Sequence, residues 1–314
     1  MRRVRDLRRA ARGLALVLLV LLAFAAPLFA APARSAPAPA LAQAQGQVPR
    51  GQSLFRPALG GPMAYSLYLP PGCATGEENY AVVYLLHGYG GNENDSLDAG
   101  GLAATADRLI AAAEIPPLIV VMSALGNSWY LDNPDPGGGA AKTAVTQDLR
   151  QHIEASYRAH RHREGRGLAG LSMGGYGAVR LALHRPDLYA AAASLSGAIL
   201  PDLQPRQAFS AAQLWLFGPV FGVPFDAARF NASNMFQPLA GFANPADVLP
   251  IYLACGDDDY FDLHHGAIAL FLALERIGAN LELRITDGGH IWEVWARALP
   301  EALAFVGRHL NPAK

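Results

Sequence analysis

The sequence predicts an α/β fold in which a mostly parallel sheet carries helices on both faces. Two apolar runs, Ala81–Leu86 and Leu118–Met122, have the length and composition of parallel strands that are buried on both faces. Segments with helical spacing, such as 142–158, alternate with the strands at the interval of βαβ units. With 314 residues, of which 52% are hydrophobic and 16% charged, the chain can bury one large core.

The remaining regular elements continue the same alternation. The pattern predicts further buried strands at 189–195, 250–255 and 281–285, and further helices at 102–113, 176–184, 265–277 and 291–310. Polar and apolar residues alternate over Met63–Leu69, which predicts an edge strand that ends at Pro70.

The N-terminal 42 residues have the order of a secretory signal peptide. Several arginines precede a wholly apolar run, Leu14–Ala26, and Ala40-Leu41-Ala42 fits a cleavage site. The alternative is an uncleaved anchor helix, because apolar character continues to Ala31. Residues 43–52 are expected to be a spacer and 53–314 the folded domain, which would lie in the periplasm or outside the cell, with or without a membrane anchor.

Net charge and cysteine content bear on nucleic-acid binding and on disulfide formation. The net charge of −1 gives no indication of nucleic-acid binding. An oxidising compartment would permit a disulfide between the two cysteines. Cys73 is expected in a loop and Cys255 at the end of a buried strand, so the spacing leaves the disulfide open.

Gly170-Leu-Ser-Met-Gly174 is the only G-x-S-x-G motif in the sequence. An apolar run ends at Ser172 and a helical segment follows, so the serine is expected on the sharp strand-to-helix turn of a nucleophile elbow. The flanking glycines fit because a side chain there would collide with so tight a turn. The alternative is an ordinary glycine-rich loop in a chain with 32 glycines.

A serine nucleophile needs a base and an acid, and in hydrolases with an elbow these follow the serine in the order acid, then histidine. Of nine histidines, His290 alone follows a buried strand within a flexible turn, Asp287-Gly-Gly-His290. Three candidates for the acid follow the preceding strand, namely Asp257, Asp258 and Asp259. Spacing cannot choose among them.

An oxyanion hole needs two preorganised backbone N–H groups. One is expected from Met173, directly after the serine, and the other from the loop after His87-Gly88, at Tyr89. A separate segment, residues 197–247, breaks the βα pattern with proline, glycine and aromatic residues. This insert is expected either to cap an apolar acyl pocket or to pack its aromatic side chains, Phe209 among them, onto the sheet.

Five motifs in order resemble the family named "Putative esterase" within the α/β-hydrolases, which includes tributyrin esterases, S-formylglutathione hydrolases (esterase D), feruloyl esterases and antigen 85 mycolyltransferases. The motifs lie at residues 85–95, 126–130, 170–178, 254–259 and 288–290. The resemblance spans roughly residues 55–310 and implies an α/β-hydrolase fold.

The resemblance also implies a role for each matching residue. It implies Ser172 as nucleophile, His290 as base, Asp259 as acid with Asp258 as the alternative, and the amides of Tyr89 and Met173 as oxyanion donors. One departure is Ser96-Leu97, where relatives often carry an aromatic residue. Trp129 and Trp292 are candidates for the pocket wall, with a place in the core as the alternative.

The sequence therefore predicts a secreted serine carboxylesterase that acts on small-molecule, lipid or carbohydrate esters through an acyl-enzyme. The alternatives are a mycolyltransferase-type acyltransferase and a binding protein on a decayed hydrolase scaffold. No cofactor and no metal are expected, and His264-His265 beside the aspartates is interpreted as a solvated helix start.

Overall fold

The computed structural model describes residues 45–135, 138–204 and 210–310 of the chain. The chain from Gln43 onward forms one compact unit. The predicted signal segment and its cleavage site, residues 1–42, and Phe209 of the insert lie outside the described residues. No helix within the described part is long and apolar enough to cross a membrane.

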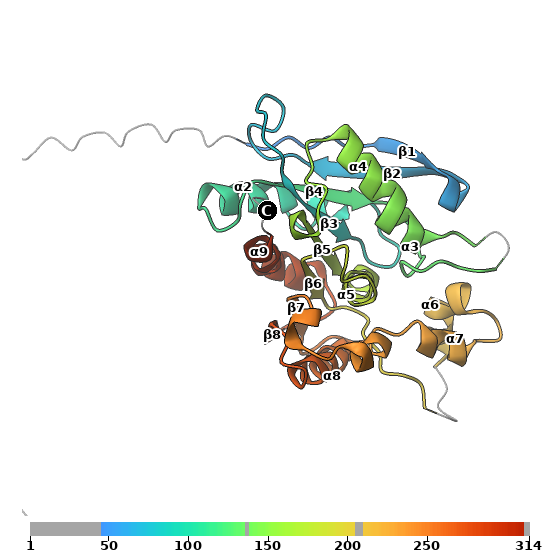
Figure 1. Ribbon diagram of the computed structural model, residues 1–314. Coiled ribbons are helices and arrows are strands. Elements are labelled where there is room, and N and C mark those ends of the chain that lie inside the picture. Colours follow the sequence, from blue (N-terminus) through green and yellow to red (C-terminus); the bar gives the residue numbers. More distant parts are fainter. Residues whose placement is uncertain (1–44, 136–137, 205–209, 311–314) are drawn as a thin grey trace, which may run out of the picture. The chain divides into compact units, whose positions relative to one another are not determined.

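The centre of the unit is an eight-stranded sheet in the order β1-β2-β4-β3-β5-β6-β7-β8 (Figure 1). The strands are β1 (Gln52–Arg56), β2 (Gly61–Tyr68), β3 (Ala81–Leu86), β4 (Leu118–Ser123), β5 (Arg166–Leu171), β6 (Ala191–Leu195), β7 (Ile251–Gly256) and β8 (Leu281–Thr286). From β4 to β8 every neighbouring pair is parallel, whereas β2 is antiparallel to both β1 and β4. The predicted mostly parallel sheet is confirmed.

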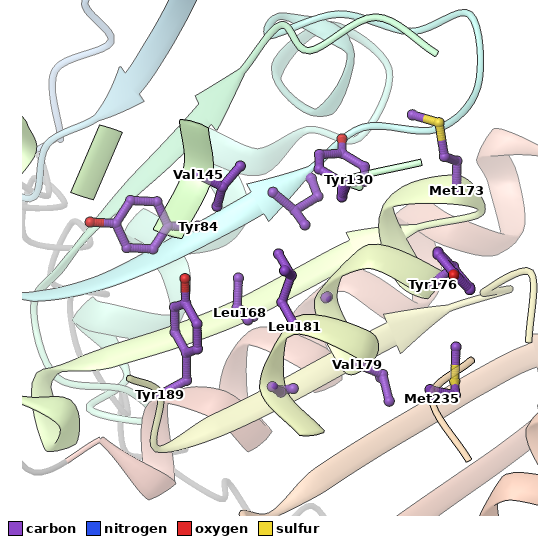
Figure 2. Close-up of a cluster of buried hydrophobic side chains, with 14 of the residues drawn as sticks. Tyr84, Tyr130, Val145, Leu168, Met173, Tyr176, Val179, Leu181, Tyr189 and Met235 are labelled. Carbon is purple, nitrogen blue, oxygen red and sulfur yellow. The ribbon is translucent and has the colours of Figure 1, made fainter. Parts of the chain in front are cut away.

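Helices cover both faces of the sheet. On one face lie α2 (Leu102–Ala111) and α9 (Trp292–His309), and on the other α4 (Arg150–Ser156), α5 (Met173–His184) and α8 (Leu263–Glu275). Side chains of β3 alternate between the two cores, so the uninterrupted apolar run of this strand follows from burial on both sides. Figure 2 shows part of the α5 side, with Tyr84 of β3, Leu168 of β5 and Tyr189, which precedes β6, in the same cluster as the α5 residues Val179 and Leu181.

Two sequence predictions need correction near the start of the domain. The strand predicted at 63–69 is not an edge strand, because β1 pairs on its outer side. The half-exposed, polar composition of β1 gave no strand signal. The ordered chain also begins earlier than residue 53: Gln47 exchanges two backbone hydrogen bonds of 2.8 Å with Leu69, within the predicted spacer.

Four predicted helices, α2, α5, α8 and α9, are found with bounds shifted by one to three residues, and two other segments differ more. The helix predicted at 142–158 consists of α3 (Ala141–Thr143), a π-helical turn (Ala144–Leu149) and α4. The insert contains α6 (Ala211–Phe221), α7 (Ala227–Ala232) and short 3₁₀ turns, with its own cluster of aromatic rings from Phe217, Phe221, Phe225 and Phe230. The insert is therefore partly regular and partly held by aromatic packing.

A buried ion network ties α4 to the start of β5. Glu154 accepts a hydrogen bond of 2.7 Å from Arg166 and one of 2.9 Å from Arg150. Glu154 and Arg166 are both buried, and Arg166 also donates to the carbonyl of Leu188. The carboxylate of Glu154 is thus the counter-charge of two guanidinium groups.

We expect Glu154→Gln to lower the free energy of unfolding by about 3 kcal/mol, because it leaves buried positive charge without its counter-charge. Asp187→Asn is the matched control, since Asp187 pairs with Arg185 at the surface, where such pairs contribute about 0–1 kcal/mol. Urea unfolding of both variants measures the difference. Equal losses would contradict the assigned role of the network.

Candidate active site

Ser172 occupies the sharp turn between β5 and α5. Its backbone has a positive φ, with φ 52° and ψ −119°, which is unfavourable for a residue with a side chain. A Cβ at Gly170 would collide with the backbone of Gly174, and one at Gly174 would collide with the carbonyl oxygen of Leu86. Both glycines of the motif are therefore required by close backbone approach, as an elbow demands.

His290 lies beside the serine and links it to a carboxylate. Its Nε2 is 2.9 Å from Ser172 Oγ, and its Nδ1 is 2.7 Å from Asp259 Oδ2. Because an ionised carboxylate only accepts hydrogen bonds, Nδ1 carries the proton and Nε2 is free to accept from the serine hydroxyl. The ring is 8% exposed and packs edge-on against Trp295 and Phe261.

The structure brings Asp259 to His290, whereas its two neighbours point to solvent. Asp259 is 2% exposed, and Asp257 and Asp258 are exposed. Burial acts to raise the pKa of Asp259, but the hydrogen bond and charge of His290 and the N–H of Phe261 outweigh it and hold the pKa below its ordinary value. Asp259 is therefore ionised at neutral pH and orients the imidazole.

The backbone N–H groups of Tyr89 and Met173 are the two candidate oxyanion donors, and neither has a hydrogen-bond acceptor within the described part of the chain. The loop that carries Tyr89 approaches the serine closely, since a Cβ on Gly88 would lie 3.4 Å from Ser172 Cβ. Gly88 O accepts from Gly91 N–H at 3.1 Å. In the planar trans Gly88–Tyr89 peptide, the Tyr89 N–H then points away from that contact.

The side chain of His87 strengthens this arrangement, a role that the sequence did not indicate. Its Nε2 accepts the N–H of Leu125 at 3.1 Å, so Nδ1 carries the proton and donates to Gly88 O at 2.7 Å. Burial lowers the pKa of His87, against smaller opposing effects of the Gly88 hydrogen bond and of Asp95 and Glu93. The ring is therefore neutral and can fill both roles at neutral pH.

A pocket of about 690 Å³ opens at Ser172 and His290. Most of its lining is apolar, and aromatic rings dominate it: Tyr89, Trp129, Trp215, Phe217, Tyr260, Phe261, Trp292 and Trp295. Trp129 and Trp292 thus line the pocket, as predicted for its wall. Ser96 and Leu97, the departure from the family pattern, are buried in α1 (Asp95–Asp98) and do not line the pocket.

The insert contributes two of these rings, Trp215 and Phe217, both from α6. Its other described aromatic residues pack within the insert or against the core. The insert therefore contributes rings both to the pocket lining and to the core, and that it covers an acyl-binding pocket stays a prediction. Tyr260 and Phe261 were missed by sequence analysis, although their position directly after Asp259 placed them beside the site.

The other titratable groups named by the sequence lie apart from this chain of hydrogen bonds. Two sets of side chains could offer metal ligands within 4.8 Å of one another, namely Asp262 with His264 and His265, and Asp257 with Asp258 and Asp287. Most of these groups are exposed, and the expectation of no metal stays a prediction. Cys73 and Cys255 are free, so the disulfide that the sequence left open is not formed.

Comparison with known proteins agrees with this geometry. The family model described as "Putative esterase" matches residues 57–306. The chain belongs to this esterase family. An acetyl esterase of Caldicellulosiruptor saccharolyticus is 25% identical over 251 residues, which are 74% of this chain and 85% of that protein. An esterase of Mycobacterium tuberculosis is 30% identical over 257 residues, but this chain spans only 54% of its length.

Solved structures show that this esterase has the α/β-hydrolase fold. A ferulic acid esterase superposes with a TM-score of 0.72 and 28% identity, over 85% of this chain and 99% of that one. An S-formylglutathione hydrolase of Agrobacterium tumefaciens has a TM-score of 0.69 and 19% identity, over 85% and 97% of the two chains. The predicted family, fold and class of ester-hydrolysing enzyme are confirmed.

We expect Asp259→Asn to lower kcat by about 10³- to 10⁴-fold, because an amide favours the wrong imidazole tautomer. Asp258→Asn is the control, and we expect it to change kcat less than about threefold, since the exposed side chain does not contact His290. Steady-state hydrolysis of p-nitrophenyl acetate measures both. Comparable losses in the two variants would show that the acid is wrongly assigned.

Proposed function

We propose that this esterase hydrolyses acyl esters through a covalent acyl-enzyme on Ser172, with His290 as general base and Asp259 as the acid that orients it. The observation that carries the proposal is the continuous chain of hydrogen bonds from Ser172 Oγ through His290 to Asp259, of which Ser172 and His290 line an aromatic pocket. This chemistry requires a nucleophile within about 2.6–3.2 Å of its base, and a third group that hydrogen-bonds the base and orients it.

The proposed reaction has two half-reactions. Ser172 Oγ attacks the ester carbonyl while its proton passes to His290 Nε2, and the N–H groups of Tyr89 and Met173 stabilise the oxyanion. His290 then returns the proton to the leaving alkoxide, the alcohol departs, and the acyl group stays on Ser172. In the second half-reaction His290 takes a proton from water, which attacks the acyl-enzyme, and the released acid leaves Ser172 with its proton restored.

The volume and the aromatic lining of the pocket favour esters with bulky apolar groups as substrates. A volume of about 690 Å³ exceeds what an acetyl group fills, and the rings that line it offer stacking surfaces. Methyl ferulate belongs in the substrate panel because the ferulic acid esterase is 28% identical. Product analysis with and without an added sugar or lipid alcohol separates hydrolysis from the alternative acyl transfer.

We also propose that the enzyme acts outside the cytoplasm, in the periplasm or beyond it. The arginine-rich start, the apolar run Leu14–Ala26 and the site Ala40-Leu41-Ala42 support export. Mass spectrometry of the protein recovered from cell fractions tests this. A chain beginning at Gln43 fits cleavage, whereas an intact chain in the membrane fraction fits the anchored form and an intact cytoplasmic chain contradicts export.

We expect Ser172→Ala to lower kcat by about 10⁵- to 10⁶-fold and to abolish labelling by a fluorophosphonate probe, since the nucleophile is lost. Ser194→Ala is the matched control: Ser194 is a buried serine of β6 whose hydroxyl has no hydrogen-bond partner among the described residues. Kinetics and mass spectrometry of the labelled peptide measure both effects. Substantial activity in Ser172→Ala would overturn the proposed function.

We expect Trp215→Ala to raise KM about 2- to 10-fold for p-nitrophenyl octanoate and methyl ferulate, because an aromatic contact contributes about 0.5–1.5 kcal/mol. KM for p-nitrophenyl acetate should change less, since an acetyl group does not reach the pocket rim. Phe55→Ala is the control, because Phe55 is as exposed as Trp215, at 70% against 68%, but lies on β1 outside the pocket. Equal effects of the two variants would contradict a role for α6 in substrate selection.

A further inference from the structure

We propose that the turn of residues 125–130, which follows β4, positions the oxyanion loop His87–Gly91, and that Tyr130 and Asn127 are its positioning residues. The inference rests on the proposed function, since it concerns the geometry of the Tyr89 N–H. Neither side chain is placed to touch the reacting atoms: Tyr130 and Asn127 are absent from the pocket lining, and each acts through the loop's backbone.

The turn holds the oxyanion loop on both sides of Tyr89. The Tyr130 hydroxyl donates to the carbonyl oxygen of His87 at 3.0 Å, and the Asn127 side chain accepts the N–H of Gly90 at 2.6 Å. The N–H of Leu125 holds the His87 ring that orients the Gly88 carbonyl. Three hydrogen bonds from one turn thus fix the residues before and after the proposed donor.

The backbone of this turn is strained in a way that serves these contacts. Trp129 and Tyr130 are consecutive non-glycine residues with φ 53° each, a conformation that costs of order 1–3 kcal/mol per residue and persists only where its surroundings require it. With this backbone conformation, the side chains of Trp129 and Tyr130 both pack against α5. The Trp129 ring lies edge-on against Tyr176, and a Cβ on Gly177 would come within 2.5 Å of the Tyr130 ring.

The hydroxyl of Tyr130 does more than satisfy a buried polar group. Tyr84, Tyr130 and Tyr189 are all at most 1% exposed and belong to the same cluster of buried side chains (Figure 2). The hydroxyls of Tyr84 and Tyr189 have no hydrogen-bond partner within the described part of the chain, whereas that of Tyr130 bonds to the oxyanion loop. The fold therefore tolerates buried tyrosines without partners, and the Tyr130 contact is a specific one.

The Tyr130 hydroxyl also keeps its proton wherever the enzyme would work. Burial raises its pKa well above the ordinary value, against a smaller opposing effect of the His87 carbonyl. The hydroxyl is consequently protonated at neutral pH and donates to the His87 carbonyl.

The test compares Tyr130→Phe with Tyr84→Phe and Tyr189→Phe, each of which removes one buried hydroxyl. We expect Tyr130→Phe to lower kcat about tenfold, less than the 10²–10³-fold loss of a whole oxyanion donor. KM should stay within about twofold and the pH profile of kcat/KM should not move, because His290 and Asp259 are untouched. Affinity for a trifluoromethyl ketone analogue, whose hemiketal oxyanion occupies the same position, should fall by the same factor as kcat/KM.

A second variant and a second measurement keep the test independent of folding and of turnover. Asn127→Ala removes an exposed side chain, opens no cavity and should show the same kinetic pattern. Amide hydrogen exchange of a peptide covering residues 87–91 should accelerate in Tyr130→Phe and Asn127→Ala, and remain at the wild-type rate in Tyr84→Phe and Tyr189→Phe.

The outcomes separate the two proposals. Unchanged exchange in the loop, or a kcat loss no larger than in the control variants, overturns the positioning role even when Ser172-dependent activity is present. Wild-type activity that survives Ser172→Ala overturns the proposed function instead, while accelerated exchange would still support the structural link between the turn and the loop.

Discussion

The strained backbone of Ser172 is the constraint on which the rest of the site depends. Its N–H donates to the carbonyl of Leu195 at 2.8 Å, and its own carbonyl accepts from Tyr176 and Ala198. A residue in this conformation costs of order 1–3 kcal/mol, which the surrounding contacts must offset. Because the turn is fixed by strands and helix together, the direction of Oγ and of the Met173 N–H is set before any substrate arrives.

A second constraint joins the two loops that carry the other members of the site. The loops after β7 and β8 lie backbone to backbone: Asp257 N–H donates to Thr286 O at 2.9 Å, Asp258 N–H donates to Gly288 O at 3.1 Å, and a Cβ on Gly256 would collide with the Gly288 carbonyl. This pairing leaves the side chains of Asp257 and Asp258 exposed and turns Asp259 inward toward His290. The pairing of the two loops thus determines which of the three carboxylates meets His290.

These constraints explain what sequence could predict. The strands at 81–86 and 118–123 were predictable because burial on both faces leaves an uninterrupted apolar run. Ser172 was found because it follows such a buried strand at a turn flanked by glycines. His290 was found from its glycine turn alone, because β8, which precedes it, is an edge strand with partly or fully exposed residues and is not buried as predicted. Spacing alone could not choose among the three aspartates, because an irregular loop has no period that fixes side-chain direction. Likewise β1 was missed, because polar and apolar residues do not alternate along it: Phe55 is exposed, whereas the charged Arg56 is buried.

The turn at Trp129 connects substrate selection with oxyanion geometry. Its indole stacks on Phe217 of α6 with ring centroids 4.0 Å apart, and its Nε1 donates to Leu216 O at 3.0 Å. The neighbouring Tyr130 holds the loop that carries Tyr89, and the Tyr89 ring packs against Trp215 of the same helix. A shift of α6 to admit a larger substrate would therefore reach the oxyanion loop by two routes, through Trp129 and through Tyr89. The contacts that join the insert to the site thus run through Tyr89 itself and through the turn at Trp129, where two consecutive non-glycine residues have a positive φ.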